Sequence, residues 1–219
     1  NWNTPYLTMY PDSEGKIARE IHKFAKNGLL YRGQKPVMWS VVEKTALAEA
    51  EVEYKEHKSI TIWIRFPVVK TNVEVLKGAD IVIWTTTPWT MPSNRAIGFG
   101  THIEYGVYQV TSVADGAKSK AGDKLALATS LADDVKTQAK IEEWELLGTF
   151  KGGDVAGAVC HHPLRESGYD FDVPLLEGDF VTDDAGTGFV HIAPSHGEDD
   201  YFLYTKHFGI EAVPDNLND

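Results

Sequence analysis

The first segment with residues suited to chemistry is 84–94, which reads WTTTPWTMPSN. It contains four threonines and the amide of Asn94, together with two prolines that stiffen the backbone. Each threonine hydroxyl donates one hydrogen bond and can accept two, so the segment could orient a water molecule or a sugar hydroxyl. Threonine also favours strands and their ends, so a purely structural role is the alternative for the triplet. The candidates are Thr85, Thr86, Thr87 and Thr90.

A second segment, 186–201, reads GTGFVHIAPSHGEDDY. Its two glycines permit close approach of the backbone, and a short apolar strand carries His191. A turn then leads into a helix whose first turn holds Asp199 and Asp200. Carboxylates at this position can bind a ligand ammonium, but they also serve as helix caps, and both readings stay open.

The sequence gives less support to a metal site or to a covalent catalytic mechanism than to the two segments above. The candidate metal ligands do not fall into an H-E-x-x-H or C-x-x-C pattern. In a strand, adjacent His161 and His162 would point to opposite faces. No G-x-S-x-G elbow is present, and nothing around Cys160 resembles a nucleophile motif. We expect no metal site among the ligand candidates Cys160, His161, His162, His191, His196, Asp199 and Asp200.

The surrounding pattern predicts many short strands and few helices. An apolar stripe predicts a helix capped by Asp12 or Ser13 and ended by Asn27 and Gly28, and two more helices are expected over 129–141 and 198–207. This pattern indicates a β-rich α+β fold whose core is a closed or strongly curved β-barrel with flanking helices. The expected strands are 37–39, 50–54, 60–66 ending at Pro67, 81–84, 105–110, 124–128, 146–150, 171–176, 180–182 and 189–192.

Composition restricts the class of protein. The chain has 219 residues, a net charge of −11 and a single cysteine, which excludes a disulfide scaffold and favours the cytoplasm. No segment resembles a signal peptide or a membrane span, so no membrane partner is expected. The acidic balance opposes avid binding to phosphate backbones. Without an internal linker, a single domain is the better interpretation.

Both segments closely resemble the editing domain, called connective polypeptide 1, that is inserted in isoleucyl-tRNA synthetases of class I. Residues 5–9, 35–40 and 45–54 are similar to the same family, so the resemblance extends from near the first residue to about residue 209. Thr87, His191 and Gly197 distinguish the isoleucyl type from the valyl and leucyl types. HIGH-like and KMSKS-like signatures and paired cysteines are absent from the sequence, so we expect no aminoacylation by this chain.

The resemblance implies a single editing domain over 1–219, with an opening segment and helix at 1–34, the barrel core at 35–209 and an exit segment at 210–219. It implies hydrolysis, by direct water attack, of the ester in valyl-tRNA mischarged on isoleucine tRNA. The partners would be the aminoacylated 3′ end of that tRNA and the remainder of the parent synthetase. No cofactor is implied, since ATP and Mg are used at a parental site absent from this chain. A noncatalytic aminoacyl- or nucleotide-binding module and a metal-dependent hydrolase are the alternatives.

The same resemblance assigns roles to individual residues. Asp200 would bind the substrate ammonium, with Asp199 as the second choice, and His191 would exclude the extra methyl group of isoleucine. Trp89, with Trp84, would form a wall of the amino-acid pocket. The residues that would position water and adenosine and shape their loop are Thr85, Thr86, Thr87, Thr90 and Asn94.

Overall fold

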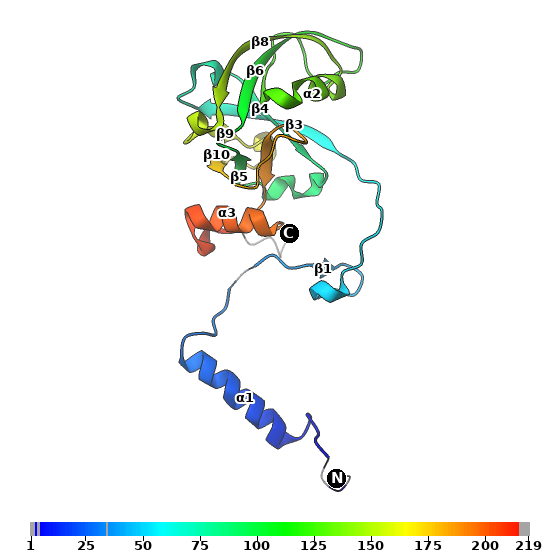
Figure 1. Cartoon of the computed structure of the whole chain (residues 1–219), viewed down its shortest axis with the longest axis vertical. Coiled ribbons are helices and arrows are strands. Elements are labelled where there is room, and N and C mark those ends of the chain that lie inside the picture. Colours follow the sequence, from blue (N-terminus) through cyan, green and yellow to red (C-terminus); the bar gives the residue numbers. More distant parts are fainter. Residues whose placement is uncertain (1–2, 4, 34, 215–219) are drawn as a thin grey trace. The chain divides into compact units, whose positions relative to one another are not determined.

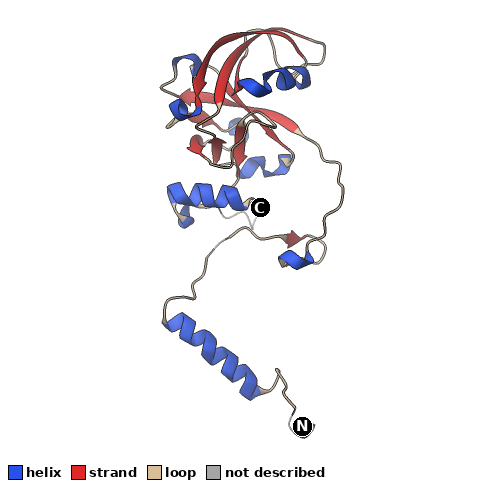
Figure 2. Cartoon of the chain, in the orientation of Figure 1, coloured by secondary structure: helices blue, strands red, loops and turns tan. Residues whose placement is uncertain are grey.

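The computed structural model describes residues 3, 5–33 and 35–214. Contacts within the chain divide it into two compact units, 1–34 and 35–219. Figure 1 follows the course of the chain, and Figure 2 shows its strands, which in the described part of the chain all belong to the second unit. In the described part of the chain, no helix is both long enough and apolar enough to cross a membrane.

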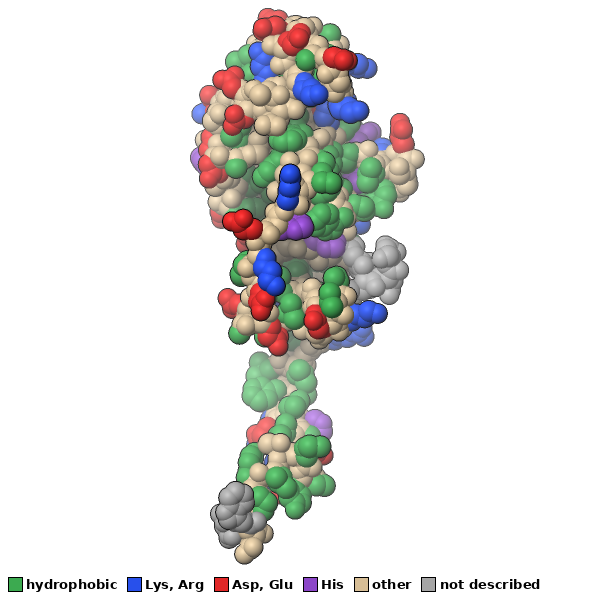
Figure 3. All heavy atoms as spheres, turned by 90° about the vertical axis from the view of Figure 1, so that its right-hand side faces the viewer, with side chains coloured by type: hydrophobic (Ala, Val, Ile, Leu, Met, Phe, Trp, Pro, Cys, Tyr) green, Lys and Arg blue, Asp and Glu red, His purple; other side chains and the backbone are tan. Residues whose placement is uncertain are grey.

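The first unit is built around α1 (Pro11–Lys26). The predicted helix is confirmed, but it starts before the expected cap: Tyr10 is the N-cap residue, and Pro11 follows at a position where a missing amide hydrogen costs nothing. Its apolar stripe includes Ile17, Ile21 and Phe24, and no residue of the helix is buried. Hydrophobic side chains are accordingly visible on the surface of this unit in Figure 3.

The second unit contains a nine-stranded mixed sheet in the order β11-β5-β10-β9-β3-β4-β7-β6-β8. The pairs β10/β5 and β4/β7 are parallel, and the other neighbouring pairs are antiparallel. The strands are β3 (Ile62–Lys70), β4 (Asp80–Thr85), β5 (Ala96–Phe99), β6 (Glu104–Val113), β7 (Lys124–Ala128), β8 (Ile141–Lys151), β9 (Val159–His161), β10 (Asp172–Glu177) and β11 (Phe189–Ile192).

Smaller elements complete the unit. A hairpin pairs β1 (Trp39–Ser40) with β2 (Thr45–Ala46). The α-helices are α2 (Ala132–Gln138) and α3 (Glu198–Phe208). The 3₁₀ turns are Glu49–Glu51, Glu74–Leu76, Pro88–Ser93, Thr129–Leu131, Gly152–Val155, Arg165–Ser167 and Ile210–Ala212.

The prediction of a closed barrel is wrong. Among the described residues, β8 and β11 are the ends of the sheet order and do not pair with each other. Closure requires the first and last strands to exchange backbone hydrogen bonds along their length, whereas β8 has 11 residues and β11 has 4. Charged side chains such as Glu142, Glu143 and Glu145 lie on β8, which suits an open edge because charge discourages further pairing. The fold is therefore α+β with an open mixed sheet.

Several element boundaries also differ from the predictions. The strand expected to stop at Pro67 continues to Lys70, because its partner changes from β4 to β9 near an irregularity in register. Residues 50–54 and 180–182 form no strand, while β5 and β9 were not predicted as strands. The predicted helix over 129–141 is a 3₁₀ turn followed by the shorter α2. Strands at β4, β7 and β11 and the helix at α3 are confirmed.

Three apolar clusters stabilise the second unit. The largest includes Phe66, Ile83, Ile97 and Tyr105, from β3, β4, β5 and β6. A second cluster lies under α2, and a third joins Leu203 of α3 to β5, β10 and β11. Because Leu203 is buried against these strands, the first turn of α3 is held next to the end of β11.

Candidate functional site

The two segments singled out from the sequence line one cavity of about 530 Å³. The cavity lies where β4 ends, where β11 runs into α3, and beside the turn Pro88–Ser93. Of the ten predicted site residues, Asn94 and Asp199 are not in the lining. Those in the lining are Trp84, Thr85, Thr86, Thr87, Trp89, Thr90, His191 and Asp200.

Strand pairing explains how the segments meet. β5 follows the turn Pro88–Ser93 directly, and β11 pairs antiparallel to β5 with His191 opposite Ile97. The amide of Arg95 also donates to the carbonyl of Ile192 at 2.9 Å. The sheet therefore carries His191 up to the threonine loop.

Hydrogen bonds within the loop fix its shape. Thr85 Oγ1 accepts the amide of Thr87 at 3.1 Å and lies 3.2 Å from Thr87 Oγ1. The Thr90 hydroxyl donates to the carbonyl of Thr87 at 2.8 Å. Ser59 donates to the carbonyl of Thr86 at 2.8 Å and ties the loop to the preceding segment. Thr85 and Thr90 are buried, whereas Thr86 and Thr87 are exposed, so the latter two are more accessible to a ligand.

His191 is held by two polar side chains. Its Nδ1 lies 2.7 Å from Asn94 Nδ2, and its Nε2 lies 3.0 Å from Thr90 Oγ1. Asn94 Nδ2 also donates to the carbonyl of Ala96 at 2.9 Å, which fixes which end of the amide faces the histidine. Because an amide nitrogen only donates, Nδ1 must accept, and Nε2 must carry the hydrogen. A directed chain results, from Asn94 through His191 and Thr90 to the carbonyl of Thr87.

The surroundings keep this histidine neutral. His191 is 8% exposed, and burial, with smaller effects of His162 and His196, lowers its pKa from 6.5 to about 4. The ring is therefore an uncharged, rigid part of the cavity wall at neutral pH. Asn94 contacts this ring but lies outside the cavity lining.

Asp200 is the acidic group of the cavity. It lies in the first turn of α3, and its Oδ2 accepts the amide of Ala193 at 2.8 Å. Burial raises its pKa from 3.8 to about 6; the Ala193 bond acts against this shift, and the charge of Asp199 adds to it. A Cβ at Gly197 would lie 3.0 Å from the Asp200 carboxyl carbon, so this glycine leaves room for the carboxylate. Asp199 is exposed and lies outside the lining.

The two tryptophans differ in their placement. Trp84 is half-buried and packs against Gly186, whose φ is +77° and where a Cβ would lie 3.1 Å from the indole. Trp89 also lines the cavity, but its side chain is 66% exposed. Trp84 is therefore the firmer wall.

Sequence reasoning missed part of the lining. Phe180 and Thr182 were expected only as part of a strand, and they lie with Ala185 in a segment without a regular element, so nothing in the sequence marked them as site residues. His196 was considered only as a metal ligand, yet its Nε2 lies 3.1 Å from Ser93 Oγ and connects the two segments. Only its position in the 186–201 motif could have indicated this role.

The metal-ligand candidates do not converge. Within the described ranges, no three His, Cys, Asp or Glu side chains form a group that could hold an ion. Cys160 is buried, which raises its pKa to about 12 and keeps it a thiol. His162 is occupied: its Nδ1 accepts the amide of Leu164, and its Nε2 bonds the carbonyl of Met91.

Comparison with known proteins shows the family of the chain. Residues 1–207 match the family model for class I tRNA synthetases (I, L, M and V). The isoleucine–tRNA ligase of Rhodopseudomonas palustris is 53% identical over 206 residues, which cover 93% of this chain and 20% of the ligase. The Caulobacter vibrioides ligase is 50% identical over 224 residues, which cover all of this chain and 23% of the ligase. The chain thus spans about a fifth of the length of these relatives.

One solved structure supports the fold. The crystal structure described as GlLeuRS-CP1 superposes with a TM-score of 0.53 at 19% identity. The match covers 69% of this chain and 63% of the other.

Proposed function

Because the chain belongs to the class I tRNA synthetases (I, L, M and V), we propose that it is an isoleucyl-type editing domain that hydrolyses valyl-tRNA mischarged on isoleucine tRNA. The observation that carries this proposal is the convergence of the threonine loop and the Asp200 carboxylate in one cavity. A hydrolase for aminoacyl esters needs both an acidic group that binds the cationic amine of the substrate and polar groups at the ester. The cavity provides both within about 530 Å³.

The amine of the substrate is assigned to Asp200. Oδ2 is already engaged by the Ala193 amide, which leaves Oδ1 to accept from the ammonium. With a pKa of about 6, the carboxylate is largely ionised at neutral pH. An approaching ammonium favours that ionised form further, because an opposite charge lowers the pKa of a carboxyl group.

The ester and the attacking water are assigned to the threonine loop. Thr86 and Thr87 are exposed residues that line the cavity. Thr90 has already donated its hydrogen to Thr87 and faces the Nε2 hydrogen of His191, so it positions the histidine and the loop. Hydrogen bonds that become stronger as charge develops on the ester oxygen would accelerate direct attack by water. No covalent intermediate or cofactor is required in this scheme.

Specificity is assigned to His191. One methylene is worth only ~1 to 3 kcal/mol in a hydrophobic pocket, for which isoleucine against valine is the standard example. A second site that rejects the larger side chain by contact supplies the missing discrimination. The ring is suited to this role because Thr90 and Asn94 keep it from turning away.

Deacylation by a full-length ligase carrying this domain tests the proposal. Release of valine from valyl-tRNA is compared for the unchanged enzyme, Asp200→Ala and the matched control Asp199→Ala. Losing a charged hydrogen bond lowers the rate by roughly 10- to 150-fold for Asp200→Ala, whereas the exposed Asp199 is expected to have little effect. Absence of deacylation by the unchanged enzyme would instead support a binding module, and loss on adding a chelator would support a metal hydrolase.

A further inference from the structure

A second cavity, of about 350 Å³, lies in the sheet unit next to α2. Its walls come from β3, β4 and β7, from the segment 114–123 and from the end of α2. The residues with recognisable chemistry in its lining are Trp63, Arg65, Lys118, Ser119, Gln138 and Lys140. The proposed editing chemistry uses none of them.

The charge of this cavity is opposite to that of the whole chain. The chain carries a net charge of −11, yet the lining contains three basic side chains and no described carboxylate. Arg65 pairs with two carboxylates outside the lining, Asp123 at 2.6 Å and Asp80 at 3.7 Å, so it adds no net positive charge to the cavity. Lys118 and Lys140 belong to the lining and have no ion pair among the described residues, so the lining contains two lysines that no carboxylate pairs.

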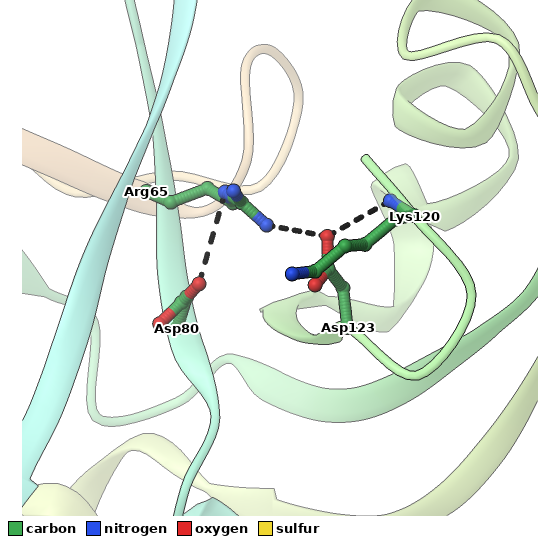
Figure 4. Close-up of polar contacts among 4 residues, drawn as sticks. All are labelled: Arg65, Asp80, Lys120 and Asp123. Carbon is green, nitrogen blue, oxygen red and sulfur yellow. Dashed lines mark hydrogen bonds and ion pairs between the residues drawn. The ribbon is translucent and has the colours of Figure 1, made fainter. Parts of the chain in front are cut away.

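The lysine-bearing wall is held in a fixed shape. Figure 4 shows Asp123 between Arg65 and Lys120: its carboxylate accepts from the Arg65 guanidinium and, at 3.0 Å, from the backbone amide of Lys120. The amide of Ala114 donates to the carbonyl of Lys140 at 2.9 Å. Lys140 itself has a φ of +56°, a backbone conformation that lysine rarely adopts. The segment is therefore tied to β3 at one end and to the turn after α2 at the other.

The cavity adjoins the candidate editing site through a pair of tryptophans. Trp63 lines the second cavity and Trp84 lines the first. The two residues are opposite each other in the register of the neighbouring strands β3 and β4, and their ring centroids are 6.5 Å apart. A flexible nucleic-acid strand whose end occupies the first cavity can thus continue over the tryptophans to the second cavity.

From this geometry we propose that the second cavity binds a nucleotide of single-stranded RNA, with its base against Trp63 and its phosphates against Lys118 and Lys140. Aromatic side chains beside a basic groove are the usual means of holding single strands without reading their sequence. The volume suits one nucleotide-sized group. That the RNA is the strand leading to the aminoacylated 3′ end rests on the proposed editing function.

Binding of a short fluorescent single-stranded RNA, followed by anisotropy up to millimolar protein, tests the site in the 219-residue chain. The first variant is the double charge reversal Lys118→Glu/Lys140→Glu. Its control, Lys26→Glu/Lys70→Glu, changes the net charge equally at exposed lysines outside both cavities. If two phosphate contacts to the single strand are removed, the affinity for RNA should fall roughly 10- to 60-fold at ~0.05 M salt. The slope of log K against log salt concentration should decrease in magnitude by about 1.4. The control pair should lose much less.

A second variant tests the base. Trp63→Leu keeps an apolar side chain against the neighbouring core. Because one base loses its stacking partner, the affinity for RNA should fall by about 5- to 150-fold. Thermal melts of each protein establish that it is folded. Inorganic pyrophosphate and double-stranded RNA serve as competitors, and both should compete poorly.

The outcomes are separable. Equal losses for the two lysine pairs, unchanged binding by folded Trp63→Leu, effective competition by pyrophosphate, or no saturable binding by the unchanged chain would each overturn the proposal. The RNA carries no amino acid, so this result does not depend on hydrolysis. Failure of the editing function would be seen in the deacylation assay alone.

Discussion

Asn94 Nδ2 lies 2.7 Å from His191 Nδ1 while also donating to the carbonyl of Ala96, and this pair of contacts selects one neutral form of the histidine. The hydrogen on Nε2 then faces Thr90 Oγ1, and the Thr90 hydroxyl donates a hydrogen bond to the carbonyl of Thr87. The wall of the candidate site is thus connected to the threonine loop by a directed series of hydrogen bonds. A ring held in this way can exclude a substrate, because moving it would break both hydrogen bonds.

Replacement of His191 by alanine should relax specificity. The variant is expected to hydrolyse isoleucyl-tRNA while retaining hydrolysis of valyl-tRNA, because removing an excluding side chain opens space. Both deacylation rates are measured side by side in the full-length ligase, with a melt of the same preparation. If a folded His191→Ala enzyme still spares isoleucyl-tRNA, discrimination must come from elsewhere in the cavity, with Trp84 as the next candidate.

Replacement of Asn94 by aspartate tests how the ring is held. The shape is preserved, but the donors to His191 Nδ1 and to Ala96 are lost, so stability should fall by about 1 to 3 kcal/mol. A carboxylate beside Nδ1 should also raise the pKa of His191 from its value of about 4. NMR titration of the histidine ring measures this shift directly. An unchanged histidine titration would show that the Asn94 contact does not determine its protonation.

Replacement of Asp200 by asparagine should weaken catalysis and strengthen the fold. The ammonium loses its charged partner, so the apparent KM for valyl-tRNA should rise. Burial of the carboxylate is unfavourable, as its pKa of about 6 shows, so its removal should stabilise the domain by roughly 1 to 2 kcal/mol at pH 7, after allowance for a weaker Ala193 bond. Steady-state kinetics and urea unfolding give the two values. A variant that is both inactive and less stable would indicate a structural role instead.

The pH dependence of stability should change in the same variant. Between pH 6.5 and 4, His191 is protonated mainly in the unfolded chain, so acidification through this range favours unfolding. Asp200 has the opposite effect between pH 6 and 3.8, because the folded state binds its proton more tightly. The two effects partly cancel in the unchanged protein. Asp200→Asn removes the compensating group, so its loss of stability on acidification should be steeper, by up to roughly 3 kcal/mol.

Unfolding free energies at several pH values between 4 and 7 check this prediction. His191→Ala provides the complementary control, since it removes the group that penalises low pH. In that variant the stability should hold or increase on acidification through the same range. Parallel pH profiles for all three proteins would contradict the assigned pKa shifts.

The chemistry-bearing segments could be found from the sequence because their signals are local. Hydroxyl side chains next to two prolines at 84–94, and a glycine pair, a histidine and acids at 186–201, are visible as residue types at short spacing. The strands at β4, β7 and β11 and the helix α3 also follow from local patterns of apolar residues. The boundaries of β3 were predicted less well, because pairing with β9 carries that strand past Pro67.

The tertiary structure alone decided how these parts meet and whether the sheet closes. Alternation of apolar residues fixes which face of a strand is buried, but it contains no information on whether the terminal strands pair, and β8 and β11 do not. The tautomer of His191 likewise depends on its contacts with Asn94 and Thr90, and the elevated pKa of Asp200 depends on burial, which the Ala193 bond only partly offsets. Residue type determined which groups could react, because chemistry belongs to side chains. Burial and hydrogen bonding determined their state, because both depend on neighbours that only the folded chain brings together.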